Sequence, residues 1–190
     1  MKKLISFLVV VLATATLAHA QFGLVAGYTA SSTNAKAAAE EVKTASLWHA
    51  GFAYKYGLGP LTLQPAITYS MKGTTVDNLQ YQTGYVEVAL GVQFGLDLLV
   101  ARPFVVAEPF IGYQVYGNET WDQQGYNDVV DKLEYGFGVG VGCDIMDMFQ
   151  LRIEWFKNLG SLAGANAAVV EETIKNGNYQ GIKVTAGFFF

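Results

Sequence analysis

The segment 133–145, with the sequence LEYGFGVGVGCDI, alternates between two kinds of side chain. Its odd positions from Tyr135 to Ile145 are all apolar, and its even positions are glycines with a carboxylate at each end, Glu134 and Asp144. A period of two predicts a β-strand, because successive side chains of a strand point to opposite faces. A glycine-rich soluble strand would share this alternation, but glycines form a poor hydrated face. We therefore expect this face to line a narrow, crowded interior and the apolar face to contact lipid.

The same alternation recurs along the chain and predicts eight strands. We place them at 22–29, 47–56, 61–72, 85–95, 103–116, 133–145, 149–157 and 179–190. Most have about the 9–11 residues that a tilted strand needs to cross a membrane. The connections alternate between long polar loops (31–46, 73–83, 117–132 and 158–178) and short turns, as in transmembrane barrels. Pro65 lies inside the third strand, and we expect a β-bulge there because proline has no N–H to donate.

Aromatic residues on the apolar faces collect at both ends of these strands. At the end that carries the long loops they are Tyr28, Trp48, Tyr69, Tyr113, Tyr135 and Trp155. At the end that carries the short turns they are Phe22, Tyr56, Phe94, Phe149 and Phe190. Two such girdles are expected at the two interfaces of a membrane.

The first twenty residues have the features of a cleaved signal peptide. Lys2 and Lys3 precede an apolar stretch at 4–17, and Ala18-His19-Ala20 is a small-residue cleavage site. An uncleaved membrane anchor is the alternative, but the apolar stretch is short for a membrane span. We therefore expect residues 21–190 to form the mature, single-domain chain.

Charge and hydropathy narrow the class of protein further. Without Lys2 and Lys3, 12 − 2 = 10 basic residues face 16 acidic ones, a formal charge of 10 − 16 = −6, which argues against nucleic-acid binding. The single cysteine, Cys143, excludes an internal disulfide and is best interpreted as a small apolar residue. No apolar run after the leader reaches about 18 residues, so a transmembrane helix is not predicted.

An exported, half-apolar chain without such a helix can span a membrane only as a closed β-barrel, which satisfies all backbone hydrogen bonds. The predicted fold is therefore all-β: an eight-stranded antiparallel transmembrane β-barrel with an up-and-down meander. The rival all-β fold is a soluble, lipocalin-like barrel with its apolar face inside. The girdles, the glycines on the polar face and the alternation of loop lengths favour the transmembrane barrel.

Several stretches resemble the small outer-membrane β-barrel family of Gram-negative bacteria, often called porin-family. They are LQP at 63–65, YSMKG at 69–73, PFIGY at 109–113 and the final strand, which ends in Phe190. The resemblance covers residues 21–190 and implies a location in the outer membrane, in contact with lipid and lipopolysaccharide. It also implies that the barrel-insertion machinery reads Phe188 and Phe190 as an insertion signal. The family shares no catalytic set, and no cofactor is implied.

Charged residues recur on the faces predicted to point inward. They are Lys55, Lys72, Glu87, Glu108, Glu134, Asp144, Arg152, Glu154 and Lys183. An eight-stranded barrel is just wide enough to be filled by side chains, and unpaired charges inside it would be costly. These residues could line an ion path, which would make the protein a narrow porin-like channel, or form a paired network that plugs the barrel. We favour the plug.

The sequence gives less support for catalysis or for metal binding. After cleavage His49 is the only histidine, and a Ser70–His49 pair oriented by Glu87 would make a lipid-modifying enzyme of the outer membrane. A lone histidine among small polar residues is more often structural, so we predict no enzyme. One histidine and one cysteine do not make a metal site. The loops 31–46, 117–132 and 158–178 could instead bind an unknown extracellular ligand. We prefer a structural or surface-interaction role.

Overall fold

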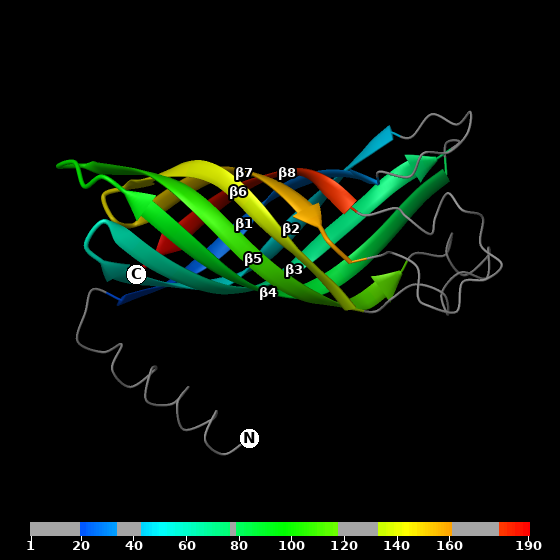
Figure 1. The fold of residues 1–190 in the computed structure, drawn as a ribbon, viewed down its shortest axis with the longest axis horizontal. Coiled ribbons are helices and arrows are strands. Elements are labelled where there is room, and N and C mark those ends of the chain that lie inside the picture. Colours follow the sequence, from blue (N-terminus) through cyan, green and yellow to red (C-terminus); the bar gives the residue numbers. More distant parts are fainter. Residues whose placement is uncertain (1–19, 34–42, 77–78, 118–132, 161–178) are drawn as a thin grey trace, which may run out of the picture.

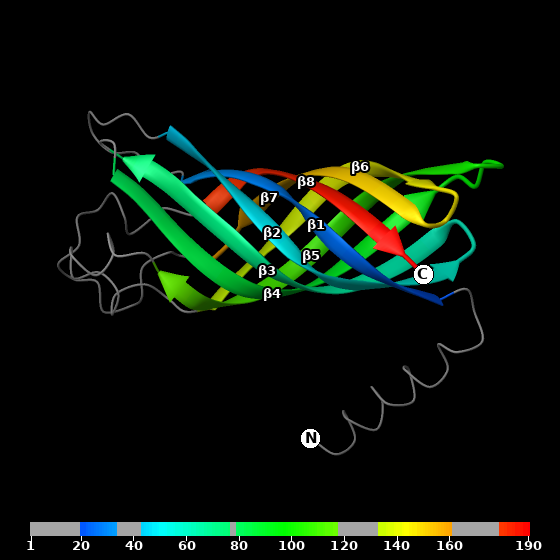
Figure 2. The same cartoon turned by 180° about the vertical axis from the view of Figure 1, so that it is seen from behind.

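Eight antiparallel strands close into one barrel in the order of the chain (Figures 1 and 2). The structure is a computed structural model that describes residues 20–33, 43–76, 79–117, 133–160 and 179–190. The strands are β1 (Ala20–Thr33), β2 (Lys43–Leu58), β3 (Leu61–Val76), β4 (Leu79–Gly95), β5 (Ala101–Gly117), β6 (Leu133–Ile145), β7 (Phe149–Asn158) and β8 (Tyr179–Phe189). Strand β8 pairs with β1 and closes the barrel. The predicted eight-stranded meander is confirmed.

Within the described residues, no helix is long and apolar enough to cross a membrane.

The register of the strand pairs fixes the tilt of the barrel. The paired residues lead once around the wall in the order Ala20, Tyr56, Leu63, Val92, Ala107, Val139, Trp155, Ile182 and Ala30. The path returns to β1 at a position 30 − 20 = 10 residues beyond its start. With strand spacings of about 4.8 Å and a rise of about 3.3 Å per residue, this shear corresponds to a tilt of about 40°.

The predicted strand bounds agree best where alternation is strict, and they fall short at the loop end. Strand β6 has the predicted bounds, Leu133–Ile145. The predicted loop 73–83 is wrong, because β3 continues to Val76 and β4 begins at Leu79. Here the strands extend beyond the aromatic girdle. Residues outside the membrane do not contact lipid, so these strand ends do not need an apolar outer face. The central parts of 31–46, 117–132 and 158–178 lie outside the described residues.

The predicted bulge at Pro65 is also wrong. Pro65 pairs with Leu90 of β4 in an unbroken register. Toward β2 the ladder has no pair at Pro65, but the pairs on either side, Ala53 with Ala66 and Tyr56 with Leu63, have the same register. The missing N–H therefore leaves a gap in the hydrogen-bond ladder and inserts no extra residue.

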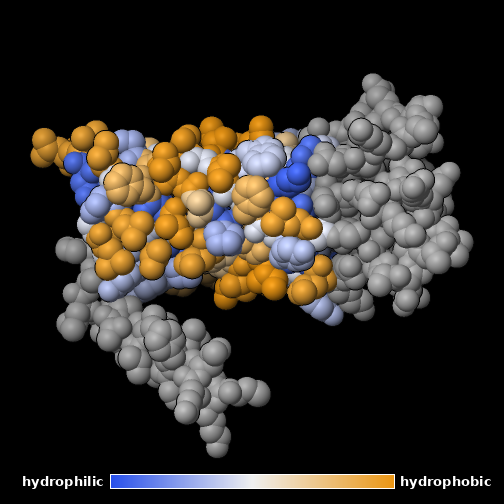
Figure 3. All heavy atoms as spheres, viewed as in Figure 1, coloured by the Kyte–Doolittle hydropathy of each residue, from blue (hydrophilic) through white to orange (hydrophobic). Residues whose placement is uncertain are grey.

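The apolar faces of the strands form the outer surface. Ile67, Val141 and Leu151 are each more than half exposed, and apolar residues cover much of the face of the barrel that is drawn in colour in Figure 3. A soluble barrel would bury these side chains, so the lipocalin-like alternative is wrong.

The predicted girdle residues lie on this outer surface, and several of them touch. At the turn end, five rings form a continuous row across the β1–β8 seam, with centroids of successive rings 5.3–6.1 Å apart. In order they are Phe52, Phe22, Phe190, Phe188 and Phe149. At the loop end, the ring centroids of Trp48 and Tyr69 lie 5.4 Å apart. The two residues of the predicted insertion signal therefore belong to an aromatic row that joins the last strands to the first.

The glycine face of β6 makes room for large inward side chains from both neighbouring strands. An added Cβ at Gly136 would lie 2.6 Å from the Phe110 ring. At Gly140 it would lie 2.6 Å from Glu154 Cγ. The bare face that identified this strand in the sequence is thus a consequence of how full the barrel is.

Candidate functional site

Among the residues that the structure describes, ten charged side chains are buried in the interior of the barrel. The cationic ones are Lys55, Lys72, Arg102, Arg152 and Lys183, and the anionic ones are Glu87, Glu108, Glu134, Asp144 and Glu154. Their formal charges cancel, 5 − 5 = 0. The structure places all nine predicted interior charges here and adds Arg102, which sequence reasoning missed. We call this set the interior charge network.

At the loop end, two lysines bridge two glutamates. Lys72 Nζ lies 2.6 Å from Glu87 Oε1 and 2.7 Å from Glu134 Oε1. Lys183 Nζ donates to the other oxygen of Glu87 at 2.8 Å. Asn158 donates to the second oxygen of Glu134. Every carboxylate oxygen of this group therefore has a cationic or amide partner.

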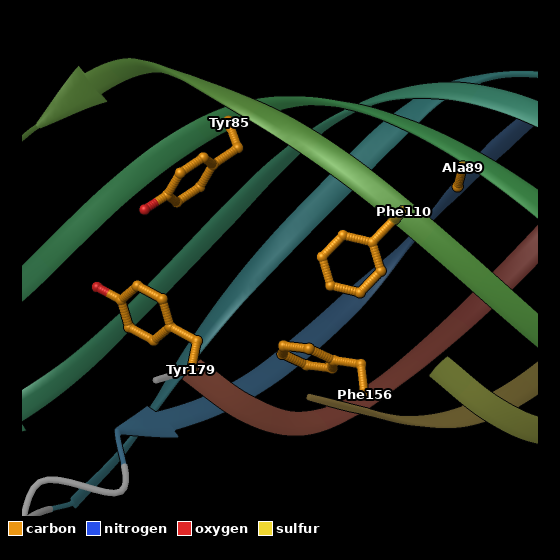
Figure 4. Close-up of a cluster of buried hydrophobic side chains, with 5 residues drawn as sticks. All are labelled: Tyr85, Ala89, Phe110, Phe156 and Tyr179. Carbon is orange, nitrogen blue, oxygen red and sulfur yellow. The ribbon is translucent and has the colours of Figure 1, made fainter. Parts of the chain in front are cut away.

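Aromatic rings surround this group of charges. Figure 4 shows Tyr85, Phe110, Phe156 and Tyr179 converging inside the barrel from β4, β5, β7 and β8. Lys72 Nζ lies 4.4 Å from the centroid of the Phe110 ring. These rings shield the ion pairs from water and add cation–π attraction to them.

The middle of the barrel is occupied by one arginine and two glutamates. Arg152 Nη1 donates to Glu108 Oε2 at 2.7 Å, and Arg152 Nε lies 3.0 Å from Glu154 Oε2. Glu154 Oε1 is buried and makes no hydrogen bond in the described structure. The side chain of Arg152 on β7 thus reaches past β6 to Glu108 on β5, and Glu154 is the least well satisfied member of the network.

A layer of amides separates this middle group from the turn end. Gln64 accepts hydrogen bonds from Gln93 at 2.6 Å and from Gln150 at 3.1 Å. Gln150 also donates to Asp144 Oδ1 at 2.8 Å. The three glutamines are almost completely buried, and neutral hydrogen bonds connect them across the lumen.

At the turn end, Asp144 joins two cations. Its Oδ1 lies 2.5 Å from Lys55 Nζ, and its Oδ2 lies 3.4 Å from Arg102 Nη1. Arg102 also contacts Asp97 at 3.1 Å and donates to the carbonyl oxygen of Pro60 at 2.9 Å. A cavity of about 280 Å³ opens at this end and is lined by these charges.

The alternation of the sequence contains a signal that places Arg102 inside the barrel. It has the same parity as Glu108 and lies directly opposite Asp144 in the β5–β6 register. Our predicted strand began one residue later, at Pro103, and so assigned Arg102 to a connection. Extending the alternation of this strand by one position would have placed Arg102 inside.

The residues of the possible catalytic pair do not form one. His49 lies opposite Ser70 in the β2–β3 register. However, its ring nitrogens contact the hydroxyl groups of Thr29 at 2.8 Å and Thr185 at 2.9 Å. Ser70 is fully buried, and its Oγ makes no hydrogen bond to any residue that the structure describes. This arrangement suits a structural histidine. Within the described strands and turns, no three His, Cys, Asp or Glu side chains gather in a way that could hold a metal ion.

Comparisons with known proteins agree with this architecture. Residues 15–166 match a family model described as "Outer membrane protein beta-barrel domain". The solved structure of Neisserial surface protein A is 12% identical, with a TM-score of 0.51 over 89% of this chain and 97% of that one. Ail of Yersinia pestis, in complex with the heparin analogue sucrose octasulfate, is 10% identical, with a TM-score of 0.47 over 90% of this chain and 99% of that one. The outer membrane enzyme PagL is also 10% identical, with a TM-score of 0.46 over 87% of this chain and 98% of that one. A comparison with curated proteins finds no match.

Proposed function

The chain belongs to the outer membrane protein β-barrel domain family, and we propose that it is a closed, non-enzymatic barrel with a structural or surface-interaction role. Its location follows from the family: the barrel lies in the outer membrane of a Gram-negative bacterium. The role itself is argued from the interior, because the family carries many functions on one scaffold.

The observation that carries the proposal is the continuous filling of the lumen. Ion pairs at the loop end, Arg152 in the middle, the glutamine layer and Asp144 at the turn end follow one another along the barrel axis. Removing one partner of a buried ion pair with good geometry is costly, because the remaining charge then lacks a partner. A paired, neutral network therefore acts as a stable plug.

The test is conductance of the refolded chain in planar lipid bilayers. We expect no discrete current steps from the unmodified protein. Arg152→Ala removes the only cation of the middle group described above, leaves Glu108 without its ion pair, and should produce steps. Ile153→Ala is the matched control, because Ile153 lies next in the same strand and faces lipid. Steps from the unmodified protein would refute the plug and favour the alternative role.

That alternative is a narrow, porin-like channel, and two observations favour it. The cavity at the turn end reaches Asp144, which lies deep enough to touch the glutamine layer. Glu154, beyond that layer, has an unbonded carboxylate oxygen that water or a cation would satisfy. A channel would need the glutamine layer and Arg152 to move aside. The bilayer recording distinguishes a channel from a plug directly.

An enzyme is the third possibility, and the environment of His49 argues against it. Both ring nitrogens contact threonine hydroxyl groups, and the histidine is buried inside the barrel wall. A lipid ester would have to enter the lumen to reach it. Hydrolysis of lipid or peptide esters that is present in the unmodified protein and lost in His49→Ala would overturn the non-enzymatic role.

For surface interaction, the loops 31–46, 117–132 and 158–178 are the predicted binding elements. A rigid barrel that carries long loops is the usual arrangement for outer-membrane binding proteins. Shortening a loop should leave folding intact and abolish binding of the unknown ligand. If each loop can be shortened without loss of adhesion or another surface phenotype, the surface-interaction role fails.

A further inference from the structure

Two adjacent turns at the turn end carry a set of exposed apolar side chains. They are Leu96, Leu98, Leu99 and Val100 from the β4–β5 turn and Met146 and Met148 from the β6–β7 turn, and we call them the apolar turn patch. We propose that this patch inserts into the periplasmic leaflet of the outer membrane. Its partners there would be phospholipids, at the boundary between their headgroups and acyl chains.

The patch is exposed and rigid. Leu99 is fully exposed, and the other five side chains are between 43% and 67% exposed. The two turns are joined by a hydrogen bond from Met146 N to the Val100 carbonyl oxygen at 3.0 Å. Six exposed apolar side chains held in one unit need an apolar partner, because a contiguous patch of this kind is unfavourable in water.

The β4–β5 hairpin continues the lipid-facing surface beyond the girdle. Leu96 N donates to the Pro103 carbonyl oxygen and Leu98 N to the Ala101 carbonyl oxygen, at 3.0 and 2.9 Å. These bonds keep the register of the β4–β5 pair, in which Phe94 lies opposite Val105. Leu96 and Leu98 therefore share the outward parity of Phe94, and the turn extends the surface that already faces lipid.

The opposite face of the same hairpin is polar. Asp97 lies opposite Arg102 in this register, and the two side chains form an ion pair at 3.1 Å. Both line the cavity that opens at the end of the lumen. The hairpin is thus amphipathic, with charges toward the cavity at the mouth and leucines toward the outside. That sidedness favours lipid as the partner over a protein seated across the mouth.

The requirements of the turns do not explain these residues. Two-residue hairpin turns prefer Gly, Asn and Asp, whereas one turn here consists of Leu99 and Val100. In the other turn, Met146 has a φ of 52° and Asp147 a φ of 57°. A left-handed backbone is unfavourable for most residues other than glycine. Glycine at position 146 would avoid this backbone strain, so the presence of methionine there points to a role for its side chain.

The lengths of the apolar columns agree with insertion at one side. On β4 and the turn that follows it, the outward apolar residues run from Val86 to Leu98, 98 − 86 = 12 positions, or about 30 Å along the axis of the tilted barrel. On β8, across the barrel, they run from Ile182 to Phe190, 190 − 182 = 8 positions, or about 20 Å. The apolar band of such barrels is about 25 Å tall. A barrel with unequal columns buries more apolar surface when it tilts toward its longer side.

The test is the depth of a fluorescent label at Leu99. In a Cys143→Ala background, Leu99→Cys carries the environment-sensitive NBD fluorophore, and the protein is folded into vesicles of phosphatidylethanolamine and phosphatidylglycerol. Quenching is measured with doxyl-labelled lipids and with iodide on both sides of the membrane. Gly57→Cys is the matched control near the end of β2, because Gly57 lines the cavity at the mouth of the lumen and an added Cβ there meets nothing within 4 Å. Met148→Cys reports on the second turn of the patch.

We expect doxyl lipids to quench the labels at Leu99 and Met148 and iodide to quench them several-fold less than the label at Gly57. Iodide quenching at Leu99 equal to that at Gly57 would overturn the proposal. The patch would then be a water-exposed surface available to a periplasmic protein. The result does not depend on whether the barrel conducts.

Discussion

Lys72 offers the sharpest test of the energetics of the interior charge network. It is fully buried, and its ammonium group contacts Glu87 and Glu134 and lies over the Phe110 ring. Lys72→Met keeps the volume of the side chain and removes the charge. Removing one partner of a buried ion pair costs about 3–5 kcal/mol, because the remaining carboxylate is left without compensation. Glu87 keeps Lys183 as a partner, so most of this cost should arise at Glu134.

The assay is urea unfolding of the chain folded in lipid vesicles, followed by the emission of the lipid-facing Trp48 and Trp155. We expect Lys72→Met to lower the free energy of unfolding by about 3–5 kcal/mol. The double variant Lys72→Met/Glu134→Gln should recover most of the loss, since it removes both charges. Lys157→Met, on a half-exposed lysine of β7, should change stability by less than about 0.5 kcal/mol. A single variant no less stable than this control, or a double variant as unstable as the single, would refute the reasoning.

Three further variants test packing, backbone strain and the seam. Gly140→Ala should destabilise the barrel by about 1–3 kcal/mol because its Cβ would overlap the Ile153 carbonyl oxygen, whereas Gly138→Ala, with no neighbour closer than 3.6 Å, should be neutral in the same urea assay. Asp147→Gly should raise the free energy of unfolding by about 1 kcal/mol by relieving a left-handed backbone, and an unchanged midpoint would argue against strain there. Phe190→Ala should slow folding into vesicles, measured as the heat-modifiable band on gels, because it breaks the aromatic row across the seam; folding at the unmodified rate would contradict that role.

Alternation in the sequence predicted the wall of the barrel because each membrane-spanning residue has only two environments. Strand β6 shows this most clearly, since its glycines face a filled lumen and its apolar residues face lipid. Parity also placed Glu87, Arg152 and Lys183 inside. The alternation disappears where the strands leave the membrane, so the sequence predicts a loop at 73–83 although both strands continue into it.

The partners within the network could not be predicted, because they depend on shear and side-chain reach across the lumen. Lys72 on β3 contacts Glu134 on β6, a strand with which β3 shares no hydrogen-bond ladder. The expected bulge at Pro65 failed for a related reason. A sequence shows that an N–H is missing, but only the register shows that the ladder tolerates a gap.

Accessibility of Ser70 tests most directly whether the lumen is closed. Ser70 is fully buried and points inward, and Ser70→Cys in a Cys143→Ala background adds a thiol there with little change in volume. A charged methanethiosulfonate reagent is applied to either side of vesicles, with Gly57→Cys at the exposed turn end as the control. The plug predicts rapid modification at residue 57 and none at residue 70 from either side. Modification of both thiols at similar rates would mean that the lumen is open to water, and would contradict the account.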